Sequence, residues 1–213
     1  MIEIAHRLSS VASSATLLLS QRAEVLRREG KPIINLTVGE PDFDTPQHIK
    51  DSAIDAIQRG FTKYTAVDGM APLKDAIIGK LARDNALTYT ADQVIVSVGA
   101  KQSLFNAFAA LLNDGDEVII PAPYWTSYPE MIRIFDAKPV IVTGAVDQHL
   151  KITPAQLAGA ITKKTKLLIL NSPNNPTGMC YTRSELAEFA AILLQNPHIA
   201  IAVSYTHLTL PTI

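Results

Sequence analysis

Short apolar runs alternate with longer amphipathic stretches over most of the chain. The apolar runs lack polar alternation, which is typical of strands in a parallel sheet that is covered on both faces. Strands are predicted over residues 93–99, 116–121, 139–143, 166–171 and 199–203. Helices are predicted between them, over residues 101–113, 124–135, 153–161 and 182–195. The pattern predicts an α/β fold with a mostly parallel sheet flanked by helices, and such sheets bind ligands beyond the carboxyl ends of their strands.

The first 92 residues show a different pattern, in which helices dominate. Helices are predicted over about 14–29, 46–58 and 70–85. Between the first two, residues 33–46 are predicted to form a short strand that runs into a proline-rich loop.

The composition is that of an ordinary soluble globular protein. Of the 213 residues, 47% are hydrophobic and 18% are charged, and the net charge is −1. The sequence has no excess of basic residues that would indicate a nucleic-acid partner. It also has no run of charges that would indicate binding to an anionic membrane. The single cysteine, Cys180, excludes an internal disulfide and fits a reducing compartment. The N-terminal residues form neither a signal peptide nor a membrane span, so we expect a cytoplasmic protein.

Several common catalytic and binding motifs are absent. The sequence contains no G-x-G-x-x-G, no G-x-x-x-x-G-K-[ST] and no G-x-S-x-G, so the dinucleotide, P-loop and nucleophile-elbow interpretations lack their fingerprints. The five histidines share no ligand-like spacing, and with a single cysteine we expect no metal site.

Two segments at the predicted carboxyl edge of the sheet favour a phosphorylated ligand. Gly99 ends a predicted strand, so the backbone amides of Ala100 and Lys101 open the next helix and could bind an anion such as phosphate. An ordinary strand–helix turn is the alternative and is the more frequent case. Trp125, the only tryptophan, follows the next strand, where its ring could stack on a planar group instead of packing in the core.

The segment NSPNNPTG, residues 171–178, follows a third strand at the same edge. Its prolines Pro173 and Pro176 fix φ and keep Ser172 and Asn175 out of the helical region. Such a rigid turn suggests that the Asn175 amide is aimed at a ligand. Together the three segments predict a pocket for a phosphorylated planar heterocycle.

The chain resembles the class I aminotransferases of fold-type I, which use pyridoxal 5′-phosphate (PLP), and it is most similar to the bacterial aspartate aminotransferase branch. Six motifs that keep the family's order and spacing between residues 9 and 204 carry the resemblance. They are SSAT (13–16), NLTVGEPDFDTP (35–46), KYTAVDGMAPLKDAI (63–77), SVGAKQSLFNAF (97–108), PYWTSYPEM (123–131) and NSPNNPTG (171–178).

The resemblance implies a domain organisation and an activity. It implies a PLP-binding large domain over residues 46–204, preceded by an N-terminal arm and small-domain segment over residues 1–45. The implied reaction is amino-group transfer between an amino acid, aspartate in the first place, and a 2-oxo acid, in a cytoplasmic homodimer. The amino donor stays open, because prephenate, aromatic and broader specificities occur in the same branch.

The resemblance also implies which residues bind the cofactor. Ala100 and Lys101 would hold the phosphate of PLP, and Trp125 would stack on its pyridine ring. Asn175 would donate a hydrogen bond to the 3′-oxygen of the ring. Tyr64 would reach the phosphate in the neighbouring subunit, although from the residues alone a packing tyrosine is the simpler interpretation.

Four residues would contact the substrate if the resemblance holds. Gly39 would contact the α-carboxylate through its backbone, and Lys101 would attract a distal carboxylate, which favours dicarboxylic substrates. Trp125 and Asn175 would line the same site.

The sequence departs from the family after Ser204. The family continues there with an aspartate that pairs with the pyridine nitrogen, whereas residues 205–213, YTHLTLPTI, contain no acidic residue and match nothing in the family. The family's Schiff-base lysine, in a Ser-x-x-Lys segment, and its arginine for the α-carboxylate are not matched either, so we assign no catalytic residue to this chain.

We therefore expect a large domain that is incomplete at its C-terminus, with residues 205–213 as a non-native tail. The chain itself is expected to be inactive and its parent enzyme active. The alternative is a non-catalytic fold-type I module that binds a ligand or a partner.

Overall fold

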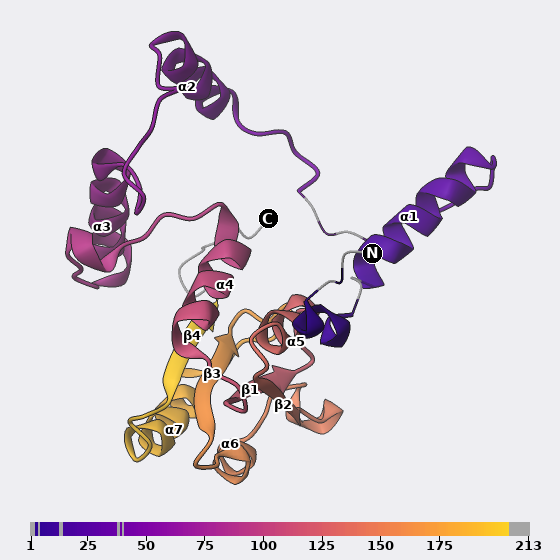
Figure 1. Cartoon of the computed structure of the whole chain (residues 1–213), viewed down its shortest axis with the longest axis vertical. Coiled ribbons are helices and arrows are strands. Elements are labelled where there is room, and N and C mark those ends of the chain that lie inside the picture. Colours follow the sequence, from indigo (N-terminus) through magenta and orange to yellow (C-terminus); the bar gives the residue numbers. More distant parts are fainter. Residues whose placement is uncertain (1–2, 4, 13–14, 38, 40, 205–213) are drawn as a thin grey trace. The chain divides into compact units, whose positions relative to one another are not determined.

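The computed structural model describes residues 3, 5–12, 15–37, 39 and 41–204. The chain divides into two compact units, one containing residues up to 12 and from 97 onwards, the other residues 13–96 (Figure 1). The predicted domain boundary after residue 45 stays a prediction, and the predicted tail at 205–213 lies outside the described residues.

A parallel sheet forms the centre of the first unit. Its strands are β1 (Glu117–Ala122), β2 (Lys138–Thr143), β3 (Thr165–Asn171) and β4 (Ala200–Ser204). Their order is β2-β1-β3-β4, and all three neighbouring pairs are parallel. Parallel neighbours need a crossover connection, and here helices supply it. They are α5 (Ser127–Arg133), α6 (Pro154–Ala160) and α7 (Arg183–Leu194). The predicted α/β fold with a mostly parallel sheet flanked by helices is confirmed.

Apolar side chains are buried on both faces of this sheet. Val118 and Ile120 belong to one core cluster, with residues of α5 and of α4 (Gly99–Leu111). Ile119, between them, belongs to a second cluster with Leu157 of α6 and Phe189 of α7. Because successive strand residues point to opposite faces, a strand covered on both sides is apolar at consecutive positions, which explains the apolar runs in the middle of β1 and β3.

Local capping signals define where the crossover helices begin. Thr153 accepts a hydrogen bond from the Gln156 amide, 3.2 Å from N to Oγ1, and Pro154 follows at the first helical position as predicted. Pro129 lies in the first turn of α5, where its missing N–H would have had no helical acceptor. A short helical turn, η3 (Val146–Gln148), precedes α6.

The second unit consists mainly of helices. They are α1 (Ala15–Arg28), α2 (Gln47–Gln58) and α3 (Ala71–Asn85), with the short turn η2 (Ala91–Gln93). Lys74 of α3 is buried and pairs with Asp68, and this hydrogen bond lowers the pKa of the Asp68 carboxyl. Gly69 has a φ of +111°, and an added Cβ would lie 2.5 Å from Cγ2 of Val96, so only glycine fits there.

Two of the predicted strands are wrong. Residues 93–99 contain the end of η2, an extended stretch and the first residue of α4, and residues 33–37, 39 and 41–46 have no strand either. In both segments apolar side chains such as Ile34 and Ile95 are exposed. A strand needs a neighbouring backbone for a continuous ladder of hydrogen bonds. The Val96 amide donates to the Asp68 carbonyl at 3.0 Å, but the described residues form no such ladder with either segment.

One further helical turn, η1 (His6–Ser10), belongs to the first unit. The amide of Ala12, just after it, donates to Oε2 of Glu130 in α5 at 2.7 Å. Among the described residues, no helix combines the length and hydropathy needed to cross a bilayer.

Candidate functional site

The N-terminus of α4 forms the first part of the site. Gly99, its first residue, has a φ of +80°, a conformation that glycine adopts at little cost. The Val98 amide donates to Oε1 of Gln102 at 2.5 Å, and no side chain of the described residues caps the amides of the first turn. The exposed amides of Ala100 and Lys101 therefore lie at the positive end of an uncapped helix, where an anion is favoured.

Trp125 lies beside this helix start. The Nζ atom of Lys101 lies 4.9 Å from the centroid of the Trp125 ring, a distance at which an ammonium group is attracted to the π-face. The other support of the ring is Tyr128, edge to face at 5.3 Å between centroids. Trp125 is half-buried, so part of the indole stays accessible to a ligand.

The loop after β3 brings Asn175 to the same edge of the sheet. Nδ2 of Asn174 donates to the carbonyl of Pro123 at 3.1 Å, which ties this loop to the segment that carries Trp125. The backbone amide of Asn175 donates to Oδ1 of Asn171 at 2.6 Å. The side chain of Asn175 is exposed and makes no hydrogen bond within the part of the chain that the structure describes.

The same loop contains unusual backbone geometry. The peptide bonds before Pro173 and Pro176 are both cis, as is the one before Pro123. Gly178 has a φ of +72°. The Gly178 amide donates to the Asn174 carbonyl at 2.8 Å, and the Thr177 hydroxyl donates to Oδ1 of the same asparagine. The loop is therefore closed on itself around Asn174.

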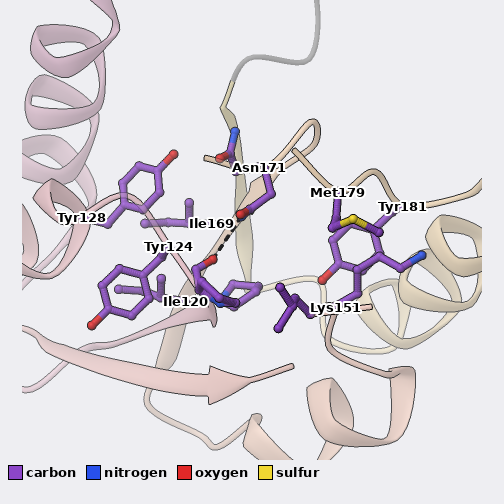
Figure 2. A pocket seen from close by; sticks show the side chains of 12 residues that line it. Ile120, Tyr124, Tyr128, Lys151, Ile169, Asn171, Met179 and Tyr181 are labelled. Atoms are coloured by element: carbon purple, nitrogen blue, oxygen red, sulfur yellow. Dashed lines mark hydrogen bonds between the residues drawn. The ribbon is translucent and has the colours of Figure 1, made fainter. Parts of the chain in front are cut away.

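A small recess lies next to the loop, beyond the ends of β1 and β3 (Figure 2). It has room for about one water molecule, so it is not itself a cofactor pocket. Figure 2 shows Tyr124 and Tyr128 on one side and Lys151, Met179 and Tyr181 on the other. Burial raises the pKa of Tyr181.

One lining residue of this recess, Lys151, forms an ion pair. The Nζ atom of Lys151 lies 2.7 Å from Oε1 of Glu185, the residue whose carboxylate also accepts the Thr182 amide at the start of α7. The hydrogen bond from Lys151 lowers the pKa of the Glu185 carboxyl, and the capping contacts act in the same direction.

Residues 31–206 match a protein family described as aminotransferase class I and II. The chain belongs to this family. It is 48% identical over 211 residues to an aspartate/prephenate aminotransferase of Nitrosomonas europaea, a match that covers 98% of this chain and 53% of the relative. It is 50% identical over 193 residues to an aspartate aminotransferase of Bacillus sp. strain YM-2, covering 91% of this chain and 49% of the relative.

Solved aminotransferase structures share the fold. The aspartate aminotransferase of Rhizobium meliloti superimposes with a TM-score of 0.92 at 46% identity, over 96% of this chain and 51% of that one. The Thermus thermophilus aspartate aminotransferase with maleate gives a TM-score of 0.90 at 40% identity, over 95% of this chain and 53% of that one. The chain therefore belongs to the aspartate aminotransferase branch and spans about half the length of the relatives it matches.

The family uses PLP, and the residues around α4 are chemically suited to it. An uncapped helix N-terminus suits the phosphate, a half-buried indole suits the ring, and the unpartnered amide of Asn175 suits the ring oxygen. The residues present fit the group. No cluster of three or more potential metal ligands occurs among the described residues.

Four of the predicted site residues lie in the first unit. Contacts link Lys101 to Trp125 directly and the loop of Asn175 to the Trp125 segment, while Ala100 adjoins Lys101 in α4. Gly39 and Tyr64 lie in the other unit, where both are exposed, and their roles stay predictions.

Sequence reasoning missed the residues that hold the site loop. Asn171 and Asn174 lie inside the motif that drew attention to Asn175, so their side chains could have been considered as loop supports. Lys151 offered no such signal, because its contacts in the fold are with residues 29 and 34 positions away.

Proposed function

We propose that this protein transfers an amino group between an amino acid, aspartate in the first place, and a 2-oxo acid with the aid of PLP. Membership of the class I and II aminotransferases supports the reaction class. Identities of 45–50% to relatives named as aspartate or aspartate/prephenate aminotransferases support aspartate as the donor. The observation that carries the proposal is the juxtaposition of the α4 N-terminus, Trp125 and the Asn175 loop.

The cofactor-binding residues have distinct tasks in this proposal. The amides of Ala100 and Lys101 hold the phosphate, the Trp125 ring supports the pyridine ring, and Asn175 donates a hydrogen bond to the ring oxygen. When bound, PLP supplies a ring that withdraws electrons from the α-carbon of the amino acid. Tyr64 reaches the phosphate of a second subunit, so we propose a homodimer.

Two groups have a proposed role towards the substrate. The backbone of Gly39 contacts the α-carboxylate, and the Lys101 ammonium attracts the distal carboxylate of a dicarboxylic substrate. In the structure this ammonium lies over the Trp125 ring, a position from which a flexible lysine stem can swing towards an anion. Trp125 and Asn175 thereby face the substrate as well as the cofactor.

Cofactor binding can be tested with pyridoxamine 5′-phosphate, which has no aldehyde and cannot condense with lysine side chains. Trp125 is the only tryptophan, so its fluorescence reports on the site alone. Asn175→Ala should weaken binding by about 1–3 kcal/mol, the cost of losing one buried hydrogen bond. The matched control is Asn196→Ala, whose side chain only bonds the Ile192 carbonyl at the end of α7. Absence of binding by the unsubstituted chain, or equal losses in both variants, would contradict the proposal.

The reaction itself needs a residue that accepts a proton. None of the 213 residues matches the residue that has this task in the family. The printed sequence contains no Ser-x-x-Lys segment, and residues 205–213 contain no aspartate. We therefore propose that these 213 residues alone do not transaminate aspartate and 2-oxoglutarate.

The absence of an acidic residue after Ser204 also favours a second candidate, a non-catalytic binding module of the same fold. Reading the gene beyond codon 204 and assaying its product separates the two candidates. Turnover by the longer product supports the aminotransferase, and cofactor binding without turnover supports the module. Turnover by the 213 residues alone would contradict the assignment of the missing groups.

A further inference from the structure

Lys151 connects three segments that are distant in the sequence. It follows β2 and lies just before α6, and its side chain is only 12% exposed. Its ammonium donates to the carbonyl of Cys180 at 3.3 Å and to Oε2 of Glu185 at 2.8 Å. It also lies 5.7 Å from the centroid of the Tyr181 ring. One largely covered cation thus contacts the end of the site loop and the start of α7.

Tyr181, the residue next to these contacts, is held through its hydroxyl, its backbone amide and its ring. Its hydroxyl accepts the Ile152 amide at 3.2 Å, and its own amide donates to Oγ of Ser172 at 3.0 Å. Its ring packs against Phe189 with 5.2 Å between centroids. Figure 2 shows Lys151, Met179 and Tyr181 gathered together at this end of the loop.

The Asn175 loop is therefore anchored at two places. Asn171 and Asn174 hold its beginning, towards β1, and Lys151 with Tyr181 holds its end, towards α6 and α7. Asn175 lies between the anchors and is exposed, so core packing does not fix it. The direction of its side chain depends on the anchors.

We propose that Lys151 is a positioning residue that orients Asn175 for the ring oxygen of the cofactor by holding residues 180–181. The inference rests on the proposed function for the identity of the ligand, whereas the anchoring of the loop does not. A part-buried ammonium that donates to a carbonyl and to a carboxylate at once can fix a loop end more firmly than a fully exposed ion pair.

Three variants test this role. Lys151→Met keeps the length of the stem and removes the cation, and about a third of the Glu185 side chain is exposed, so water can solvate the released carboxylate. Lys151→Arg restores a cation. Lys138→Met is the matched control, because Lys138 also pairs with a glutamate, Glu117, but at the amino edge of the sheet.

The first measurement is amide hydrogen exchange, which needs no cofactor. We expect residues 174–181 to exchange roughly tenfold faster in Lys151→Met, because local opening becomes easier once the end of the loop is released. Lys151→Arg should restore most of the protection, and Lys138→Met should leave this loop unchanged. Equal exchange in the unsubstituted chain and Lys151→Met would overturn the inference, whatever the cofactor result.

The second measurement is a double-mutant cycle on pyridoxamine 5′-phosphate affinity, read by Trp125 fluorescence. Lys151→Met should weaken binding roughly three- to tenfold in the unsubstituted background and have no further effect in Asn175→Ala, because coupled residues are not additive. Additive losses would show a general loss of stability and overturn the positioning role. Faster loop exchange with no binding by the unsubstituted chain would leave the anchor standing and refute the proposed function instead.

Discussion

Asn171 connects Ser204, the last residue of β4, to the Asn175 loop. Its replacement should lower the stability of the fold and the affinity of the site. Its Nδ2 atom donates to the carbonyl of Ser204 at 2.9 Å in a buried hydrogen bond, and its Oδ1 atom accepts the Asn175 amide at 2.6 Å. The side chain is 6% exposed. Asn171→Leu has a similar volume and removes both hydrogen bonds.

The expected loss of stability depends on the surroundings of the two groups that lose their hydrogen bond to Asn171, the Ser204 carbonyl and the Asn175 backbone amide. The Ser204 carbonyl is left in a buried place, which costs roughly 1–3 kcal/mol, whereas water can reach the Asn175 amide in the half-exposed loop. We therefore expect the free energy of unfolding to fall by about 2–3 kcal/mol. For a chain of this size that corresponds to a melting temperature lower by roughly 4–12 °C.

Denaturant unfolding followed by circular dichroism measures this loss, and pyridoxamine 5′-phosphate titration measures the effect on the site. Affinity should fall along with stability, because the Asn175 loop loses its first anchor. Asn196→Ala, which removes one hydrogen bond at the end of α7, is the control and should cost less than about 1 kcal/mol. A loss below about 0.5 kcal/mol for Asn171→Leu, within the range of ordinary surface substitutions, would refute the reasoning.

Three further changes should have measurable effects. In Gly144→Ala the new Cβ would lie 2.6 Å from the backbone of Leu150, so thermal melting should reveal a loss of more than about 1 kcal/mol, and an unchanged melting temperature would contradict this clash. The hydrogen bond from Thr162 holds the pKa of Glu117 below its usual value. The ionised Glu117 carboxylate therefore stabilises the fold fully above about pH 5, and this contribution is lost as the pH falls through the lowered pKa. Glu117→Gln should flatten that acid limb of the stability profile, and an identical profile would refute the linkage. Val203 is exposed on β4, an edge of the described sheet, so the chain should self-associate in light scattering and Val203→Lys should reduce this, whereas a monomeric unsubstituted chain would contradict it.

The sequence was sufficient for the local elements of the sheet and its crossover helices. β1 and β3 could be predicted because both of their faces are covered, so the residues in the middle of each strand are apolar on both faces. The start of α6 could be predicted because Thr153 and Pro154 act on their own neighbours in the chain. The sequence could also predict that the Trp125 and Asn175 segments meet, because they leave the parallel strands β1 and β3 at one edge of the sheet. The start of α4 follows no strand, and the site itself stays a proposal.

Tertiary structure decided what depends on a partner elsewhere in the chain. Residues 93–99 are as apolar as a strand, but a strand exists only where a second backbone receives its hydrogen bonds, and no local pattern contains that information. The same holds for the site. Asn174 bonds Pro123 across 51 positions and Lys151 bonds Cys180 across 29, so the side chains that orient Asn175 are identified by their distances in the fold and not by their spacing in the sequence.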